Sequence, residues 1–166
     1  MIIRELDVED ADKFVVLNRL LSQESDYMLL KPSEAGISVD KQAEMTRKMK
    51  LNNVSNVFVA EVDARLAGYI GVTGGLFAKN KHTCHFAVGV LKAYQRKAIA
   101  TKLIETMEAW AGDRAITRIE LSVVTENVAA VALYNRCGYK MEGLKKASLI
   151  IKNRAVDEYL MAKTFH

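Results

Sequence analysis

Apolar residues recur along the chain with two different periods, and these periods predict strands that alternate with helices. The opening segment IIREL is short and apolar, as expected of a strand. Apolar residues at helical spacing then predict a helix with one buried face, and they are Ala11, Phe14, Val15 and Leu21. Asp7 or Asp10 can cap this helix. The loop Gln23–Gly36 precedes a more exposed helix within 38–53, whose apolar positions are Val39, Ala43 and Met49.

The middle of the chain predicts three strands and a helix. NVFVAEV and RLAGYIGVTGG are typical of two strands, joined by a tight turn at Asp63 and Ala64. A third strand, HTCHFAVGVL, follows, and then a helix over AIATKLIETMEAWAG. Gly112 stands where the C-terminal cap of that helix is expected. The apolar stripe of the helix consists of Ile99, Leu103, Met107 and Trp110.

The last third predicts a strand over RIELSVV, a helix over NVAAVALYNRCGY and a closing hairpin. Asn127 is the expected N-cap of the helix and Gly138 its expected C-cap. The hairpin pairs MEGLKKASLIIK with AVDEYLMAKTF and turns at Asn153. The order β-α-α-β-β-β-α-β-α-β-β predicts an α/β (α+β) fold, with a mixed, mostly antiparallel sheet of about seven strands and about four flanking helices. The unit from Phe86 to Val124 is expected to be a right-handed parallel crossover, with a ligand at the C-terminal ends of its strands.

Length, composition and charge indicate the number of domains and the cellular compartment. The chain has 166 residues, of which 50% are hydrophobic and 27% charged, and this predicts one globular domain over 1–166. The net charge of +4 is too small to indicate nucleic acid by itself. The first residues turn acidic at once and lack a signal peptide's apolar core, and no apolar run reaches membrane-spanning length. We therefore expect a soluble cytoplasmic protein.

Two cysteines, Cys84 and Cys137, lie far apart and fit no zinc spacing, so no metal is expected. Free thiols in a reducing compartment are the expected state. A ping-pong mechanism through either residue would need an activated thiolate with basic neighbours.

The stretch VGVLKAYQRKAIATKLIE, from Val88 to Glu105, joins a strand to a helix through a basic loop. The first N–H groups of a helix have no partners inside the helix and carry the positive end of its dipole. A pyrophosphate can accept hydrogen bonds from several of them together, and Arg96 and Lys97 add positive charge beside them. An ordinary basic first turn in solvent explains the same residues, and the spacing alone does not separate the two interpretations.

Two motifs in this order resemble those of the GNAT superfamily, the acyl-CoA-dependent N-acyltransferases. QRKAIA resembles the loop motif Q/R-x-x-G-x-G/A, and ENVAAVALYNRCGYKMEG resembles N-x-x-A-x-x-L-Y with its later glycines. The second motif is matched by Asn127, Ala130, Leu133, Tyr134, Gly138, Tyr139 and Gly143. The resemblance covers essentially the whole chain and is weakest over 23–53. It implies the GNAT fold and acetyl-CoA as the cosubstrate.

One position departs from the loop motif. Ala98 stands where the family usually has glycine, whereas Ala100 lies within the pattern. If Ala98 belongs to the first helical turn, its φ is negative and alanine fits without strain. Alanine also keeps its backbone N–H, so we expect the loop still to bind the coenzyme.

The resemblance also implies which residues contact the coenzyme. The loop and the first helical turn would hold the pyrophosphate through Gln95, Arg96, Lys97, Ala98, Ile99, Ala100 and Thr101. Val88 and Val90 would pair through their main chain with the pantetheine arm, and one of their N–H groups would bind the oxyanion. Asn127, whose other role is to cap its helix, and Ala130 complete the predicted coenzyme site together with Tyr134.

By the same resemblance, Tyr134 is the general acid that protonates the leaving thiolate, because a phenol is protonated at neutral pH. A helix tyrosine that only packs on the sheet is the alternative. His85 falls near the position where many relatives place a general base. A structural strand histidine is the alternative there. Glu120 and Glu126 are weaker candidates for the base, and in some relatives water takes the proton.

The acceptor is the least defined part of the reaction. Glu24, Asp26 and Glu34 could form an acidic lip that attracts a polyamine, an aminoglycoside or a protein N-terminus, although solvated loop charge explains them too. The expected function is acetyl transfer to a primary amine of a small molecule, amino acid or peptide. The alternative is an acyl-CoA-binding regulatory module with little turnover. We expect no nucleic-acid or membrane partner, and a homodimer is one open option.

Overall fold

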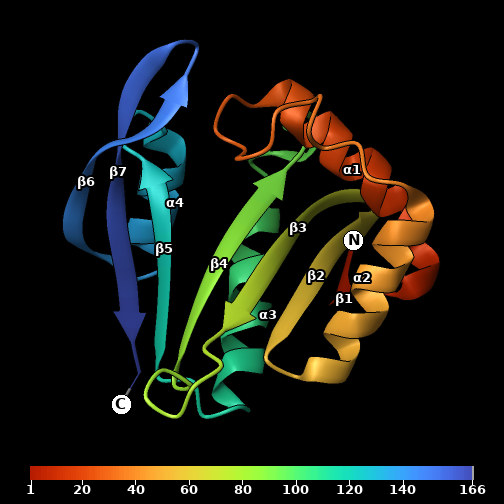
Figure 1. Ribbon diagram of the computed structural model, residues 1–166, viewed down its shortest axis with the longest axis horizontal. Coiled ribbons are helices and arrows are strands. Elements are labelled where there is room, and N and C mark those ends of the chain that lie inside the picture. The colour runs from red at the N-terminus through yellow and green to blue at the C-terminus, as the bar shows by residue number, and fades with distance from the viewer. Residues whose placement is uncertain (166) are drawn as a thin grey trace.

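The computed structural model of the protein describes residues 1–165, and its elements follow the predicted order (Figure 1). The strands are β1 (Ile2–Glu5), β2 (Ser55–Val62), β3 (Arg65–Gly74), β4 (Thr83–Val90), β5 (Arg118–Val124), β6 (Lys140–Ile151) and β7 (Arg154–Thr164). The helices are α1 (Ala11–Glu24), α2 (Val39–Asn52), α3 (Ile99–Gly112) and α4 (Val128–Arg136). Two 3-10 turns, Val8–Asp10 and Lys92–Tyr94, precede α1 and follow β4.

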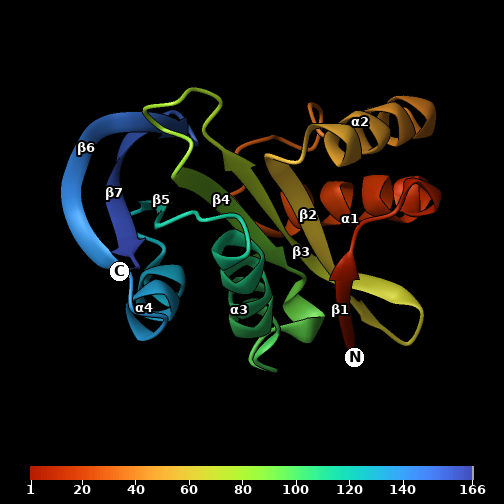
Figure 2. The same cartoon turned by 90° about the horizontal axis from the view of Figure 1, so that it is seen from below.

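The seven strands form one sheet in the order β1-β2-β3-β4-β5-β7-β6. All neighbouring strands are antiparallel except β4 and β5, which are parallel and are joined through α3. Helices α1 and α2 cover one face of the sheet, and α3 and α4 cover the other (Figure 2). The predicted fold class and the predicted parallel crossover are therefore confirmed.

The apolar stripe of α3 explains where the main core lies. Leu103 and Met107 are fully buried, and Ile99 and Trp110 nearly so, against β2, β3 and β4. Burial of this stripe on the sheet stabilises the crossover, since each large apolar side chain contributes about 1.5–3 kcal/mol when it leaves water. The same layer contains Phe86 of β4.

Both predicted hairpin turns are confirmed. Asp63 and Ala64 have φ of 48° and 61°, and Lys152 and Asn153 have φ of 50° and 61°. Two successive left-handed residues are the geometry of a two-residue turn whose twist matches that of the flanking strands.

Three local expectations need correction. On α2, Val39 is exposed, whereas the polar residues Gln42 and Thr46 are buried. Their burial is tolerated because their polar groups are paired. The Gln42 amide donates to Thr46 Oγ1 (3.2 Å), and Thr46 Oγ1 donates to the Gln42 carbonyl (3.0 Å). Gly112 is the last residue of α3 and not its cap, which is Asp113. Of the two aspartates expected to cap α1, Asp7 caps the preceding 3-10 turn, and Asp10 occupies the N-cap position of α1 without a side-chain cap hydrogen bond. By contrast, Gly138 does end α4 as expected, one residue past the cap with φ of 91°.

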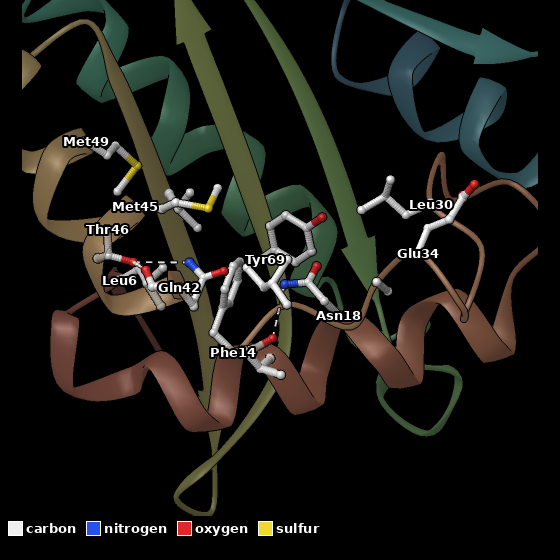
Figure 3. A pocket seen from close by; sticks show the side chains of 14 residues that line it. Leu6, Phe14, Asn18, Leu30, Glu34, Gln42, Met45, Thr46, Met49 and Tyr69 are labelled. Atoms are coloured by element: carbon white, nitrogen blue, oxygen red, sulfur yellow. Dashed lines mark hydrogen bonds between the residues drawn. The ribbon is translucent and has the colours of Figure 1, made fainter. Parts of the chain in front are cut away.

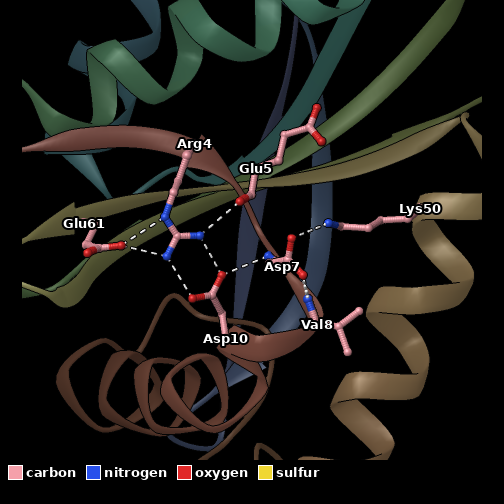
Figure 4. A network of polar contacts seen from close by, with 7 residues as sticks. All are labelled: Arg4, Glu5, Asp7, Val8, Asp10, Lys50 and Glu61. Carbon is pink, nitrogen blue, oxygen red and sulfur yellow. Dashed lines mark hydrogen bonds and ion pairs between the residues drawn. The ribbon is translucent and has the colours of Figure 1, made fainter.

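Arg4 ties β1 to β2 and to the 3-10 turn that precedes α1 (Figure 4). Its guanidinium donates to both carboxylate oxygens of Asp10 (2.6 and 2.8 Å) and to Glu61 of β2 (2.7 Å). Asp10 also accepts from the Asp7 N–H at 2.9 Å. The hydrogen bond from Arg4 lowers the pKa of Asp10, whose side chain is nearly buried. Paired in this way, the carboxylate stabilises the folded state only while it is ionised.

We expect Asp10→Asn to lower the free energy of unfolding by about 2 kcal/mol at pH 7, because it leaves Arg4 short of a partner. Since the folded pKa of Asp10 lies below its unfolded value, the wild type loses this stabilisation as the pH falls below about 4. Urea unfolding of both proteins between pH 7 and pH 3.5 should therefore show a shrinking difference. Glu44→Gln, which removes an exposed pair with Lys48, should cost under about 0.5 kcal/mol. A difference between wild type and Asp10→Asn that stays constant with pH would contradict this assignment.

Candidate active site

The sheet opens between its two parallel strands. β4 and β5 pair at only three positions, of which His85 opposite Glu120 is the last. Beyond that point the strands diverge, and β5 continues alongside β7 (Figure 1). Residues 86–90 of β4 thus pair with β3 on one side and with no strand on the other. Val88 and Val90 lie in this segment, as the predicted coenzyme site requires.

The loop after β4 presents backbone N–H groups at the start of α3. The helix begins at Ile99 without a side-chain cap, and the first N–H to be paired is that of Lys102, which donates to the Ala98 carbonyl at 3.0 Å. Within residues 1–165, the N–H groups of Ile99, Ala100 and Thr101 therefore have no partner. They can donate to an anion at the positive end of the helix dipole.

The expectation for Ala98 is wrong. It does not lie in the first helical turn with negative φ, but precedes the helix as its N-cap with φ of 59°, in the left-handed region. Arg96 is also left-handed, with φ of 61°. Backbone that alternates in this way curves its N–H groups toward one point, which is how anion-binding loops are built. The usual glycine at this position is thus explained by conformation, and Ala98 adopts that conformation at some cost.

Gln95 fixes the loop to the end of β4. Its side-chain amide donates to the Val90 carbonyl at 3.1 Å, so this amide is engaged with the protein. The Lys97 ammonium lies 5.5 Å from the centre of the Tyr94 ring, and Arg96 and Lys97 are both exposed. Two positive charges therefore flank the open helix terminus.

Tyr134 lies where the two strands begin to separate. It is 7% exposed, and its ring packs edge-on against Phe86, the first residue of β4 past the paired segment (5.8 Å between ring centres). Burial raises the pKa of Tyr134 to about 12, so the phenol is protonated at neutral pH. Its hydroxyl makes no hydrogen bond within residues 1–165, and yet it is not sealed from solvent. The group is thus available as a proton donor.

A second tyrosine holds the first in place. Tyr139 is fully buried, packs edge-on against both Phe86 and Tyr134, and donates its hydroxyl to Glu108 of α3 at 2.9 Å. The Lys163 ammonium of β7 pairs with the same carboxylate at 2.8 Å. This cluster joins α3, α4 and β7 beside the opening. Glu108 was missed by the sequence analysis, because nothing distinguishes it there from an exposed helix glutamate.

The three candidates for a general base differ in whether an ion pair already engages them. His85 is exposed on β4, and it points to the opposite face of the sheet from Phe86, because side chains alternate along a strand. Glu120 pairs with Arg118 at 3.1 Å. Glu126 pairs with Arg154, whose hydrogen bonds lower the pKa of Glu126. A carboxylate held in this way is a poor proton acceptor, so His85 or water fits the role better.

Neither thiol is activated. Both cysteines are free, with Cys84 buried and Cys137 half-buried. Burial raises the pKa of Cys84 to about 12 and also raises that of Cys137. Thiols are nucleophilic as thiolates, so neither residue favours a ping-pong mechanism.

Asn127 caps α4 as expected. Its side-chain oxygen accepts from the Ala130 N–H at 3.3 Å. This places both residues in the first turn of the helix that carries Tyr134.

The three acidic residues of the loop region each contact other groups. Glu24 accepts from the Lys92 N–H (2.8 Å), Asp26 pairs with Lys152 (2.6 Å), and Glu34 accepts from the Lys31 N–H (3.0 Å). They bind distant or neighbouring parts of the chain, which leaves little support for the acidic lip. The pair of Asp26 and Lys152 brings the tip of the β6–β7 hairpin onto the α1–α2 loop.

Within residues 1–165, no group of three or more His, Cys, Asp or Glu side chains is placed to hold a metal ion. Over the same residues, no helix has both the length and the apolar character needed to cross a membrane.

A mixed sheet that opens at its parallel pair, beside an uncapped helix terminus, defines the class of fold, and comparison with known proteins identifies the family. The acetyltransferase (GNAT) family profile matches residues 23–139, so the chain belongs to that family. The L-amino acid N-acetyltransferase AaaT of Escherichia coli is 27% identical over 109 residues. That match spans 63% of this chain and 65% of the relative.

Solved structures agree over the whole fold. A GNAT-family acetyltransferase from Streptococcus pneumoniae superposes with a TM-score of 0.94 at 25% identity, covering 99% of each chain. The yncA protein of Salmonella typhimurium, solved with acetyl-CoA, has a TM-score of 0.87 at 17% identity and covers 100% of this chain and 94% of its own. The resemblance predicted from the two motifs is confirmed.

Because Ala98 is left-handed, we expect Ala98→Gly to stabilise the protein by about 0.5–1 kcal/mol through relief of strain at its side chain. Ala100→Gly is the matched control, since it lies inside α3 and should destabilise by a similar amount. Thermal unfolding of the two variants should move Tm in opposite directions. A fall in Tm for both would contradict the left-handed assignment at Ala98.

Proposed function

We propose that the protein is an N-acetyltransferase that moves the acetyl group of acetyl-CoA directly to a primary amine of a small molecule, amino acid or peptide. The observation that carries this proposal is the opening between β4 and β5, with the protonated Tyr134 at its base. Membership of the acetyltransferase family and the acetyl-CoA held by the Salmonella relative support it. The name of the Escherichia coli relative supports an amino acid as one class of acceptor.

In this proposal the coenzyme lies along the opening. Its pyrophosphate accepts from the N–H groups of 98–101 and is balanced by Arg96 and Lys97. Its pantetheine amides pair with the β5 side of β4 at Val88 and Val90, as an added strand would. The first turn of α4, with Asn127 and Ala130, borders the arm on the other side. Gln95 acts indirectly, by holding the loop to Val90.

The chemistry follows from the two faces of β4. The neutral amine attacks the thioester carbon, and the N–H of Val88 or Val90 binds the oxyanion that forms. The intermediate collapses, the C–S bond breaks, and the thiolate takes the phenolic proton of Tyr134. The nitrogen loses its proton to His85 or to water. Because His85 and Tyr134 lie on opposite faces, base and acid would approach the thioester from opposite sides.

A regulatory module that binds acyl-CoA without turnover was the alternative from sequence, and the departure of Ala98 from the loop motif is the one sequence feature that would favour it. Ala98 keeps both the left-handed conformation and the N–H that the loop needs. No feature of residues 1–165 now favours the module over the enzyme.

We expect Tyr134→Phe to lower the single-turnover rate of acetyl transfer by about 100-fold or more, because it removes the donor and keeps the ring against Phe86. Acetyl-CoA affinity should stay within about twofold, since most coenzyme contacts lie elsewhere. Released thiol and calorimetric binding measure the two quantities separately.

Tyr139→Phe is the matched control. It removes a hydroxyl that is already bonded to Glu108, so it should lower stability by about 1–3 kcal/mol and change the chemical rate little. A Tyr134→Phe protein that reacts at the wild-type rate would remove Tyr134 from the mechanism. A wild type that binds acetyl-CoA and acetylates no amine would favour the regulatory module.

A further inference from the structure

A pocket of about 360 Å³ lies between α1, α2 and the face of the sheet that they cover (Figure 3). α1 contributes Phe14 and Asn18, α2 contributes Met45 and Met49, and β3 contributes Tyr69. The volume is at the small end of the range for ligand sites, about 300–1,000 Å³. It therefore suits a small molecule or a single side chain.

The pocket lies on one face of the sheet, one strand away from β4, and the side chains of Leu21 and Met28 cover Gly89 on that face. Tyr69 lies directly opposite Gly89 in the pairing of β3 with β4, and Gly89 stands between Val88 and Val90. Opposed residues of paired strands share a face, so Tyr69 lies on the same face as His85. A ligand that extends from this pocket past Leu21 and Met28 would thus approach the thioester from the side of the proposed base.

The chemistry of the wall selects an apolar group. Most of the lining side chains are aliphatic, aromatic or methionine, and no lysine or arginine is among them. Gln42 and Thr46 bond to one another and offer little to a ligand. A carboxylate or phosphate inside the pocket would have no cationic partner and would lose its hydration, which is costly.

Two polar atoms remain available at the wall. The Asn18 amide nitrogen donates to the Phe14 carbonyl at 3.1 Å, which leaves the side-chain oxygen of Asn18 unpaired within residues 1–165. The Tyr69 hydroxyl has no hydrogen bond in the same part of the chain, and the Tyr69 ring packs edge-on against Phe14 (5.1 Å between ring centres). An amine next to an apolar group can donate to the Asn18 oxygen and the Tyr69 hydroxyl. Glu34, exposed at the loop side of the pocket, is the only charged residue in the lining.

We infer that the acceptor amine carries an apolar group about the size of a leucine or methionine side chain, and that this group binds in the pocket between α1 and α2. The inference rests on the proposed acetyltransferase activity. It assigns Phe14, Met45 and Met49 as residues that determine specificity, and the Asn18 oxygen and Tyr69 hydroxyl as groups that orient the amine.

The test is a panel of primary α-amines that differ only in the side chain: glycinamide, L-leucinamide, L-methioninamide, L-argininamide and L-isoglutamine. kcat/KM is measured with acetyl-CoA from released thiol. Leucinamide and methioninamide should exceed each of the other three by about tenfold or more, the usual discrimination of an apolar pocket. Equal rates with glycinamide, or preference for the arginine or glutamate amide, would overturn the inference and leave the proposed function intact. Acetylation of none of the five, with acetyl-CoA bound, would overturn the inference, whereas the proposed function would fall only if no other primary amine were acetylated either.

A pair of matched variants locates the binding site. Ala35 is buried in the wall of the pocket, and Ala35→Leu should reduce the preference for leucinamide over glycinamide at least about fivefold, with the KM for acetyl-CoA unchanged. Val16→Leu enlarges a helical side chain of α1 that lines a second cavity of about 510 Å³ together with Leu20 and Tyr94, and it should leave the preference unchanged. Loss of preference in Val16→Leu alone would overturn the assignment. If Ala35→Leu does not fold by thermal unfolding, the wild-type panel still decides the inference.

Discussion

The structure depends on the early end of the pairing between β4 and β5. Backbone N–H and C=O groups are strongly driven to pair, and each of the seven strands keeps at least one strand partner along most of its length. On its β5 side, β4 loses its partner after His85. The sheet consists of two antiparallel parts, β1 to β4 and β5 to β7, joined by three residue pairs. This leaves an unpaired strand edge inside the molecule, where an extended ligand can bind.

An opening of this kind needs contacts that hold the two parts at a fixed separation. The ring cluster of Phe86, Tyr134 and Tyr139 fills the base of the opening, and the carboxylate of Glu108 joins Tyr139 to Lys163 of β7. The rings are buried and the Glu108 contacts are half-buried, so these contacts are stronger than exposed ones. At the other end, one exposed ion pair, between Lys152 and Asp26, links the hairpin tip to the α1–α2 loop, and exposed pairs contribute little stability. The base is thus firmly held, while the acceptor side is held weakly.

The loop at α3 shows how function depends on backbone conformation more than on side-chain identity. Position 98 has alanine where the family motif has glycine, and yet Ala98 occupies the left-handed region and keeps its N–H. Helix termini bind anions through N–H groups, which every residue except proline has. A substitution at this position therefore affects the stability of the loop conformation, whereas the backbone N–H donors remain.

The sequence by itself determined the order of elements, both hairpin turns, the buried stripe of α3 and the family, because each is written in local periodicity or in motif spacing. The helix stripe Ile99, Leu103 and Met107 needs only the geometry of one helix to be predicted. Only the tertiary structure decided the φ of Ala98, the buried face of α2, the partner of Glu108 and the pocket beside Tyr69. The partners of Glu24 and Asp26 are 68 and 126 residues away, and no local pattern specifies contacts at such separations. These features depend on how distant elements pack, and packing is a property of the assembled fold.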